Sequence, residues 1–158
     1  MTGRSRTEGK LPSNGTYTLL VDVDDRFETD VGALGEQRFD APVYCYTGSA
    51  FGTGGFSRID RHRRLAEGES DARHWHVDYL LGHPATSLSA VVKAHGEDVE
   101  CTVAGRLGDG PIPGFGASDC DCPSHLVSRE DFDAARREVQ TVHAEAVDAA
   151  AVTVERFE

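Results

Sequence analysis

A cluster of positive charge lies between residues 58 and 64, where four arginines accompany a single acid. The arginines are Arg58, Arg61, Arg63 and Arg64, and the acid is Asp60. A short β-forming run and a glycine-rich loop precede them. A strand that leads through such a loop into a helix presents free backbone N–H groups, which can bind an anion. Because the whole chain carries a net charge of −11, this local reversal predicts a binding site for a negative group, most simply a phosphate.

The glycine-rich loop does not match a nucleotide-binding loop. It lacks the Gly-Lys-Ser/Thr of a P-loop and the third glycine spacing of a dinucleotide fingerprint. Arginines on a helix also commonly form a solvated face, and this alternative stays open for Arg58. The clustering of the arginines favours an anion site over that alternative.

Two tyrosines and a glutamate complete an ordered set of reactive side chains. Tyr17 lies near the start of one expected strand, and Tyr46 lies near the end of another. Arg58 and His62 are four residues apart and share one side of the helix that follows. Glu100 lies on a later helix. Each also has a structural interpretation, because strand tyrosines usually pack in a core and a lone helical glutamate usually faces solvent.

In this order the residues resemble the GIY-YIG nuclease pattern. The chain is more closely similar to the Uri superfamily of mostly archaeal, often uncharacterised proteins. The resemblance runs from Gly15 to Val127 and rests on the strings GTY, YTGSA, HWHVDYLL and PGFGASDCDCPSHL, the glycine loop, and the cysteine after Glu100. Thr16 and Thr47 stand where the general motif has isoleucine. Both positions are expected to hold inward-facing β-branched side chains.

The resemblance implies metal-assisted cleavage of phosphodiester bonds in DNA. Glu100 would hold one hard divalent cation, Mg²⁺ or Mn²⁺, which would stabilise the leaving oxygen. Arg58 would bind the non-bridging phosphate oxygens through its planar fork. Tyr17 and Tyr46 would orient or deprotonate the attacking water, and His62 is an alternative proton carrier. A tyrosine base needs the arginine or the metal nearby, because a phenol ordinarily titrates at about pH 10.

A second cluster, of histidine and tryptophan, follows the basic helix. His74 and Asp78 are one helical turn apart and could pair. Trp75 could stack on a base of a single strand or a distorted duplex, although the favoured interpretation makes it the largest residue of the core. The candidate nucleic-acid contacts are therefore Arg61, Arg63, Arg64, His74, Trp75 and His76.

Three of the four cysteines lie in a pattern that could bind zinc. Cys120 and Cys122 precede His125, and with Cys101 upstream they could supply four ligands to a tetrahedral ion. The alternative is that they are small buried side chains, as free cysteines commonly are. Because no export signal is visible, a disulfide framework is not expected.

The composition fits one soluble globular domain. The chain has 158 residues, of which 39% are hydrophobic, and no apolar run is long enough to span a bilayer. Residues 1–14 lack an apolar signal region and are expected to form a disordered leader of a cytoplasmic protein. Acids number 27 against 16 lysines and arginines, and lysine is scarce. Such a composition resembles proteins of salt-loving archaea, although a GC-rich genome gives a similar bias.

The pattern of apolar and turn residues predicts an α+β fold, a small, mostly antiparallel sheet flanked by helices. The expected strands are 16–23, 30–39, 43–47, 85–93 and 124–127, the second with a bulge near Gly35. The expected helices are 55–65, 74–81 and 97–107. An extra amphipathic helix is expected to follow an N-cap within 128–131 and to end at about residue 150. Residues 15–127 would form the nuclease-like domain, and 128–158 a C-terminal helix and tail.

Three hypotheses for function follow. The first is a metal-dependent DNA endonuclease, with branched or damaged DNA and a role in repair suggested by the resemblance. The second is a non-cleaving nucleic-acid-binding module with a structural zinc site. In both, a local patch must bind the nucleic acid, because the net charge argues against general affinity. The third is a small-ligand or protein-interaction domain that dimerises through the C-terminal helix.

Overall fold

An antiparallel sheet of five strands forms the centre of the molecule. The computed structural model describes residues 11–52, 54–71, 73, 75–108, 110–115 and 124–157. The sheet strands are β1 (Gly15–Val23), β4 (Val43–Ala50), β5 (Thr86–His95), β6 (Leu126–Arg129) and β7 (Val152–Arg156). Their order is β6-β4-β1-β5-β7, and every neighbouring pair is antiparallel. The α+β class predicted from the sequence is confirmed.

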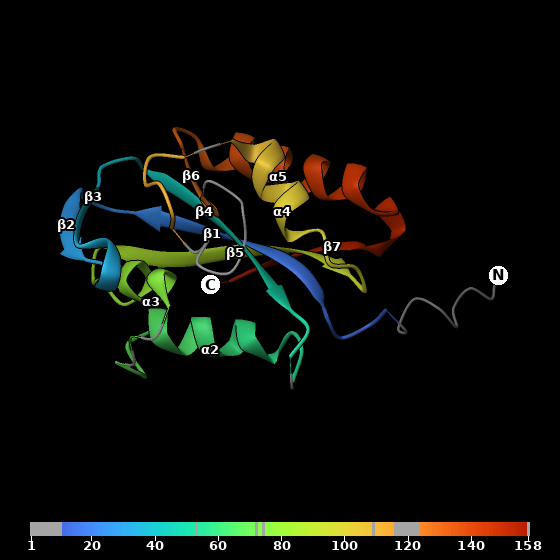
Figure 1. The fold of residues 1–158 in the computed structure, drawn as a ribbon, viewed down its shortest axis with the longest axis horizontal. Coiled ribbons are helices and arrows are strands. Elements are labelled where there is room, and N and C mark those ends of the chain that lie inside the picture. Colours follow the sequence, from blue (N-terminus) through green and yellow to red (C-terminus); the bar gives the residue numbers. More distant parts are fainter. Residues whose placement is uncertain are drawn as a thin grey trace.

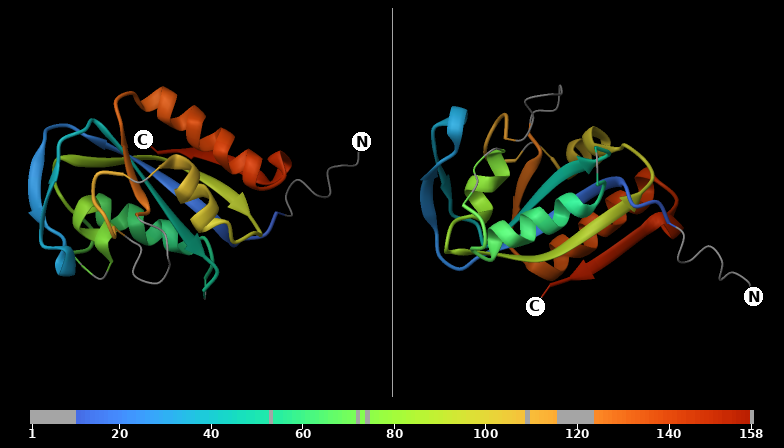
Figure 2. Two further views of the ribbon diagram at one scale, coloured as in Figure 1. Left: turned by 45° about the horizontal axis from the view of Figure 1, so that its top comes forward. Right: turned by 90° about the horizontal axis from the view of Figure 1, so that it is seen from below.

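Helices cover both faces of this sheet. One face carries α2 (Ser57–Ala66) and α3 (His76–Leu81), and the other carries α4 (Glu100–Leu107) and α5 (Phe132–Ala146) (Figure 1). The views in Figure 2 likewise place α2 and α5 on opposite sides of the strands. Because strand side chains alternate, Leu19 and Val21 of β1 join the core beneath α2 and α3, while Leu20 joins the core beneath α4 and α5. The sheet is therefore buried on both faces.

The expected second strand, 30–39, is wrong in its details. The structure forms a separate hairpin of β2 (Phe27–Asp30) and β3 (Glu36–Phe39) around the 3-10 helix η1 (Gly32–Leu34). Gly32 and Gly35 have φ angles of 55° and 75°. Glycine adopts such left-handed conformations at little cost, so these residues reverse the chain where the sequence analysis expected a bulge.

The C-terminal region also differs from its prediction. Asp131 caps α5 by accepting a 2.8 Å hydrogen bond from the N–H of Ala134, and the helix ends at Ala146. The 3-10 helix η2 (Ala149–Ala151) leads into β7, which pairs with β5 and joins the main sheet, where the sequence analysis expected only a tail. The apolar face of α5 packs in the core against the sheet. Packing against the sheet of the same chain thus accounts for the amphipathic pattern of α5. The pattern therefore gives no reason to expect a dimer through this helix.

Part of the expected leader contacts the domain. The carbonyl oxygen of Ser13 accepts a 2.8 Å hydrogen bond from the N–H of Phe56, and that of Asn14 accepts one of 2.7 Å from Gly96. Residues 1–10 lie outside the described residues. In the part of the chain that is described, no helix combines the length and the apolar character needed to cross a membrane.

Candidate active site

The two tyrosines come together because β1 and β4 are neighbouring antiparallel strands. Tyr17 is paired in register with Gly48, two residues beyond Tyr46. A Cβ atom at Gly48 would lie 2.7 Å from the Tyr17 hydroxyl oxygen and 3.2 Å from Cε2 of Tyr46. Both contacts are closer than ordinary van der Waals packing, so only a glycine leaves room for the two rings at this point.

His62 of α2 binds the Tyr17 hydroxyl from beneath the sheet. Its Nε2 lies 2.8 Å from the phenolic oxygen, and both residues are buried. Burial lowers the pKa of the His62 imidazole to about 4, so the ring is neutral at physiological pH. In the tautomer with Nε2 unprotonated, the Tyr17 hydroxyl donates to it. The other ring nitrogen, Nδ1, has no hydrogen-bond partner within the described residues.

Side chains from three other elements affect the pKa of the Tyr17 phenol. Burial raises its pKa well above the ordinary value, and interactions with Tyr46 and Glu100 act in the same direction. The Arg58 guanidinium lowers the pKa of Tyr17 by its charge and by a hydrogen bond, but does not outweigh burial. Tyr17 is therefore a neutral phenol, and the charges of Arg58 and Glu100 both affect its pKa.

Arg58 is held at the end of β4 by the backbone. Its Nη1 donates a 2.7 Å hydrogen bond to the carbonyl oxygen of Ser49. A Cβ atom at Gly52 would lie 3.7 Å from its Nη2, so the glycine loop passes close to the guanidinium. This contact fixes the direction of the side chain and uses only one of its five N–H donors.

Glu100 begins α4, and two contacts define its place. Its Oε2 lies 3.2 Å from Nδ1 of His125, whose ring is buried, while its own side chain is 23% exposed. The hydroxyl of Thr16 donates to the Glu97 carbonyl oxygen and accepts from the Val99 N–H, both at 2.9 Å. Thr16, beside Tyr17, thereby holds the segment that leads into Glu100.

Both threonines of the motif are buried as expected, but their hydroxyls also have polar roles. On the α5 side of the sheet, Thr47 and Thr18 are 2.9 Å apart between their Oγ1 atoms, and Thr18 lies 2.8 Å from Nε2 of His143. Burial lowers the pKa of His143 to about 4. These bonds satisfy polar groups that isoleucine would not present.

Trp75 is not a core residue, which corrects the favoured interpretation of the sequence. The residue is 40% exposed. The Arg58 and Arg61 guanidinium carbons lie 4.9 Å and 4.3 Å from the centre of its ring, within cation–π distance. Arg61 also donates two 3.0 Å hydrogen bonds to the buried carboxylate of Asp78, which accepts a third bond from the Trp75 N–H. Asp78 thus pairs with Arg61, and His74, its expected partner, lies outside the described residues.

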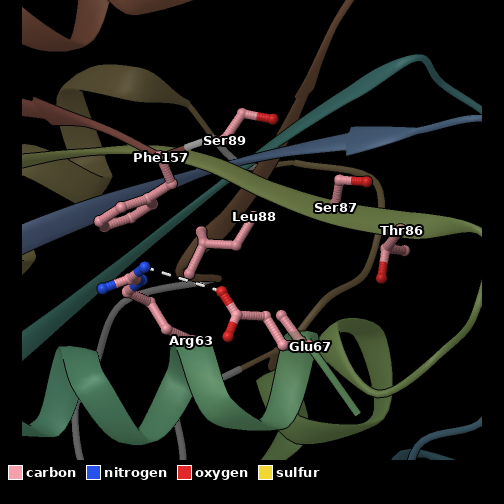
Figure 3. A pocket seen from close by; sticks show the side chains of 8 residues that line it. Arg63, Glu67, Thr86, Ser87, Leu88, Ser89 and Phe157 are labelled. Carbon is pink, nitrogen blue, oxygen red and sulfur yellow. Dashed lines mark ion pairs between the residues drawn. The ribbon is translucent and has the colours of Figure 1, made fainter.

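The remaining basic residues of α2 do not all face the site. Arg63 lines a separate pocket of about 230 Å³, where its guanidinium lies 4.6 Å from the Phe157 ring centre and 3.7 Å from a Glu67 oxygen (Figure 3). Arg64 is exposed. His76 of α3 is half-buried, and its ring lies 5.6 Å from that of Phe115. Arg58 and Arg61 lie three residues apart on one helix face, and among the described residues these two arginines contact the Trp75 ring.

The cysteines do not assemble the expected zinc site in the described region. Cys101 is disulfide-bonded, which corrects the expectation that disulfides would be absent, and its sulfur is not a zinc ligand in this structure. Cys45 is free and buried, and burial raises the pKa of its thiol to about 12. Cys120 and Cys122 lie outside the described residues, and His125 faces Glu100. Within the described ranges no group of three or more histidine, cysteine or acidic side chains could hold a metal.

The surroundings of Glu100 suit a hard cation with few protein ligands. Proteins commonly hold Mg²⁺ through one or two carboxylates and several waters, and Glu100 could supply one such carboxylate because its side chain is 23% exposed. The structure thus brings Tyr17, Tyr46, Arg58 and His62 together from two strands and one helix, and the charge of Glu100 on α4 contributes to the raised pKa of Tyr17. The sequence analysis missed the contacts of Thr16, Asp78 and His125. For Asp78 a signal was available, because an acid three residues after an N-cap position often accepts a hydrogen bond from the N-cap N–H.

Comparisons with known proteins give one match. A family model described as "Domain of unknown function DUF123" matches residues 16–148. The comparisons with curated proteins and with solved structures found no match.

Proposed function

This chain belongs to the DUF123 family, a domain of unknown function, and from the geometry of its site we propose that it is a metal-dependent nuclease that hydrolyses phosphodiester bonds in DNA. One observation carries the proposal. The hydroxyl of Tyr17 lies 2.8 Å from a neutral histidine nitrogen, and the same phenol is influenced by both Arg58 and Glu100. The resemblance to GIY-YIG nucleases assigns catalytic roles to these same residues.

The raised pKa of Tyr17 defines how it would act as a base. A free phenolate is disfavoured, so the phenol would accept the proton of the attacking water while its own proton passes to Nε2 of His62. The water oxygen would form the new bond to phosphorus as the bond to the leaving ester oxygen breaks. His62 would end the step as an imidazolium, a charged state that burial and the charges of Arg61 and Arg58 oppose and that the Asp78 carboxylate favours.

Arg58 and Tyr46 would position the phosphate. The Arg58 guanidinium, fixed by the Ser49 carbonyl, would donate to the non-bridging oxygens and offset their charge. Tyr46, 8% exposed, would orient the attacking water beside Tyr17. A divalent cation held by Glu100 would stabilise charge on the leaving oxygen. His125, at 3.2 Å, would orient the Glu100 carboxylate.

A cleavage assay with paired variants tests this proposal. We would incubate the wild-type protein with branched, nicked and single-stranded DNA, with Mg²⁺ or Mn²⁺, at low and high salt. Glu100→Ala should abolish cleavage, and Glu97→Ala is the matched control because Glu97 is an exposed acid on the same segment. If no substrate is cut by the wild type and spared by Glu100→Ala, the proposed function is wrong.

The exposed Trp75 and its two arginines favour a second candidate, a module that binds nucleic acid without cleaving it. This arrangement does not require chemistry at Tyr17. Salt-dependent DNA binding by wild type, without metal-dependent turnover on any of the substrates, would favour this second function.

A further inference from the structure

We propose that the preferred substrate has an unpaired nucleotide beside the scissile phosphate, and that its base stacks on a rim formed by Trp75 with Arg58 and Arg61. This inference rests on the proposed nuclease function and specifies the substrate class of that site.

The exposure of the rim is the first observation. Within the described part of the chain, Phe51 and Trp75 are the two large hydrophobic side chains that are exposed, at 41% and 40%. Trp75 lies beside Arg58, whose guanidinium carbon is 4.9 Å from the centre of its ring. An exposed tryptophan beside a proposed phosphate-binding arginine marks a binding surface.

Hydrogen bonds to Asp78 hold the backbone of Trp75 and the Arg61 guanidinium, and the rim lies close to the proposed reacting groups. The backbone N–H of Trp75 donates to the buried Asp78 carboxylate, and the two hydrogen bonds from Arg61 hold the same carboxylate. The centres of the Trp75 and His62 rings are 6.0 Å apart, and His62 contacts the Tyr17 hydroxyl. A base stacked on Trp75 would thus lie one side chain away from His62, the proposed proton acceptor. The rim would lose little conformational freedom when it binds the base.

The chemistry of the rim favours an unpaired base over a paired one. Bases in a duplex are already stacked on their neighbours, whereas an unpaired base can be splayed out and stacked on an aromatic ring or an arginine plane. A long duplex footprint requires many phosphate contacts, but the chain carries a net charge of −11. A protein ligand would not need the two guanidinium groups that adjoin the site, which favours a phosphate-bearing ligand.

Trp75 is the only tryptophan of the chain, so its fluorescence reports directly on the rim. The full-length Glu100→Ala variant would be titrated with three labelled DNA probes. One is a duplex with a single unpaired nucleotide, the second has an abasic residue in its place, and the third is fully paired. We expect the unpaired base to quench the fluorescence and bind most tightly, and the other two probes to leave the fluorescence largely unchanged.

Variants then separate stacking from general binding, with affinity measured by anisotropy of the labelled probes. Trp75→Leu should weaken binding of the probe with the unpaired base by roughly five- to a hundredfold and leave the other two nearly unchanged. Trp75→Phe should restore most of the affinity. Phe157→Leu is the matched control, because Phe157 also stacks on an arginine, Arg63, but in a separate pocket.

The possible outcomes distinguish this inference from the proposed function. Equal binding of the base-bearing and abasic probes, or an equal loss on all three probes in Trp75→Leu, would overturn the inference even if wild type cleaves DNA. Base-dependent quenching without any cleavage by wild type would support the rim and remove the nuclease proposal. Failure to bind any of the three probes would overturn the rim.

Discussion

Gly48→Ala tests whether the space between the two phenols is needed for activity. The added Cβ atom would lie 2.7 Å from the hydroxyl oxygen of Tyr17, where ordinary contact begins at 3.4 Å. It would also lie 2.8 Å from Cζ of Tyr17 and 3.2 Å from Cε2 of Tyr46. Gly48 does not have a positive φ angle, so the backbone accepts alanine and the effect comes from the crowded rings.

The expected magnitudes follow from these contacts. Overpacking of a filled site destabilises a protein by about 1–3 kcal/mol, and Tyr17 and Tyr46 are buried in strands that pair with each other. Restoring ordinary contact moves the Tyr17 hydroxyl away from its present position 2.8 Å from His62. Misplacement of a reacting group by about 1 Å can cost roughly a hundredfold in rate, so we expect kcat to fall by about that factor.

Two measurements separate these effects. Urea denaturation reports the free energy of unfolding, and single-turnover cleavage of labelled DNA reports the rate of the chemical step. Gly105→Ala is the matched control, because no heavy atom of the described residues, apart from its own helix and neighbours, lies within 4 Å of its Cβ position in α4. That control should gain about 0.5–1 kcal/mol of stability and keep its activity.

A double variant tests the assignment of the clash. Adding Tyr17→Phe to Gly48→Ala removes the atom that lies nearest to the new methyl group, so part of the stability should return while activity stays lost. The reasoning is refuted if Gly48→Ala alone has the stability and the cleavage rate of wild type.

The remaining predictions concern proton transfer, buried charge and the start of α4. Cleavage should fall by a similar factor in Tyr17→Phe, in His62→Phe and in the double variant, because the effects of two residues that act as one unit do not add. If the rate of the double variant in single-turnover assays falls by the product of the two single losses, this prediction is wrong. The free energy of unfolding should fall as the pH is lowered from about 6.5 toward 4, because the unfolded state binds protons that the buried rings exclude. The fall should reach up to about 3 kcal/mol for each of His62 and His143. Urea titration at each pH measures this curve, and His143→Asn should flatten it. Arg61→Ala removes an ion pair and two hydrogen bonds from the buried Asp78 carboxylate and should destabilise the fold by about 3 kcal/mol in urea, and a loss near zero would be the contrary result. Thr16→Val should raise the Mg²⁺ concentration needed for half-maximal cleavage, because the segment before α4 loses two hydrogen bonds, and an unchanged metal titration would argue against this role.

Local patterns predicted most of the fold because most elements are stabilised by periodic burial. The runs around β1, β4 and β5, and the apolar stripes of α2 and α5, were placed within a few residues. One missed element, β7, has no such signal, because its residues are mostly half-buried and it is held by pairing with β5. Pairing between segments far apart in sequence cannot be deduced from a local pattern.

The site could be predicted in its residues but not in its contacts. The motif order selected Tyr17 and Glu100, whereas the direction of each side chain depends on packing. Trp75 illustrates the limit, since the only tryptophan of a small domain is expected inside, yet two arginines hold it at the surface. Asp78 illustrates the same limit, because its ion pair joins residues 17 positions apart on two helices.

The surroundings of Tyr17 also favour one of two proposed roles for His62. The sequence suggested His62 as an alternative to tyrosine as the proton carrier. Burial, Tyr46 and Glu100 all oppose the phenolate, and Arg58 alone does not reverse them. A phenol in that environment can accept a proton only if its own proton leaves in the same step, and the Nε2 atom at 2.8 Å is the acceptor within reach. Tyr17 would therefore need His62 in order to act as a base. The variant His62→Phe keeps a ring of similar volume but has no nitrogen to accept the proton, so it should not restore cleavage.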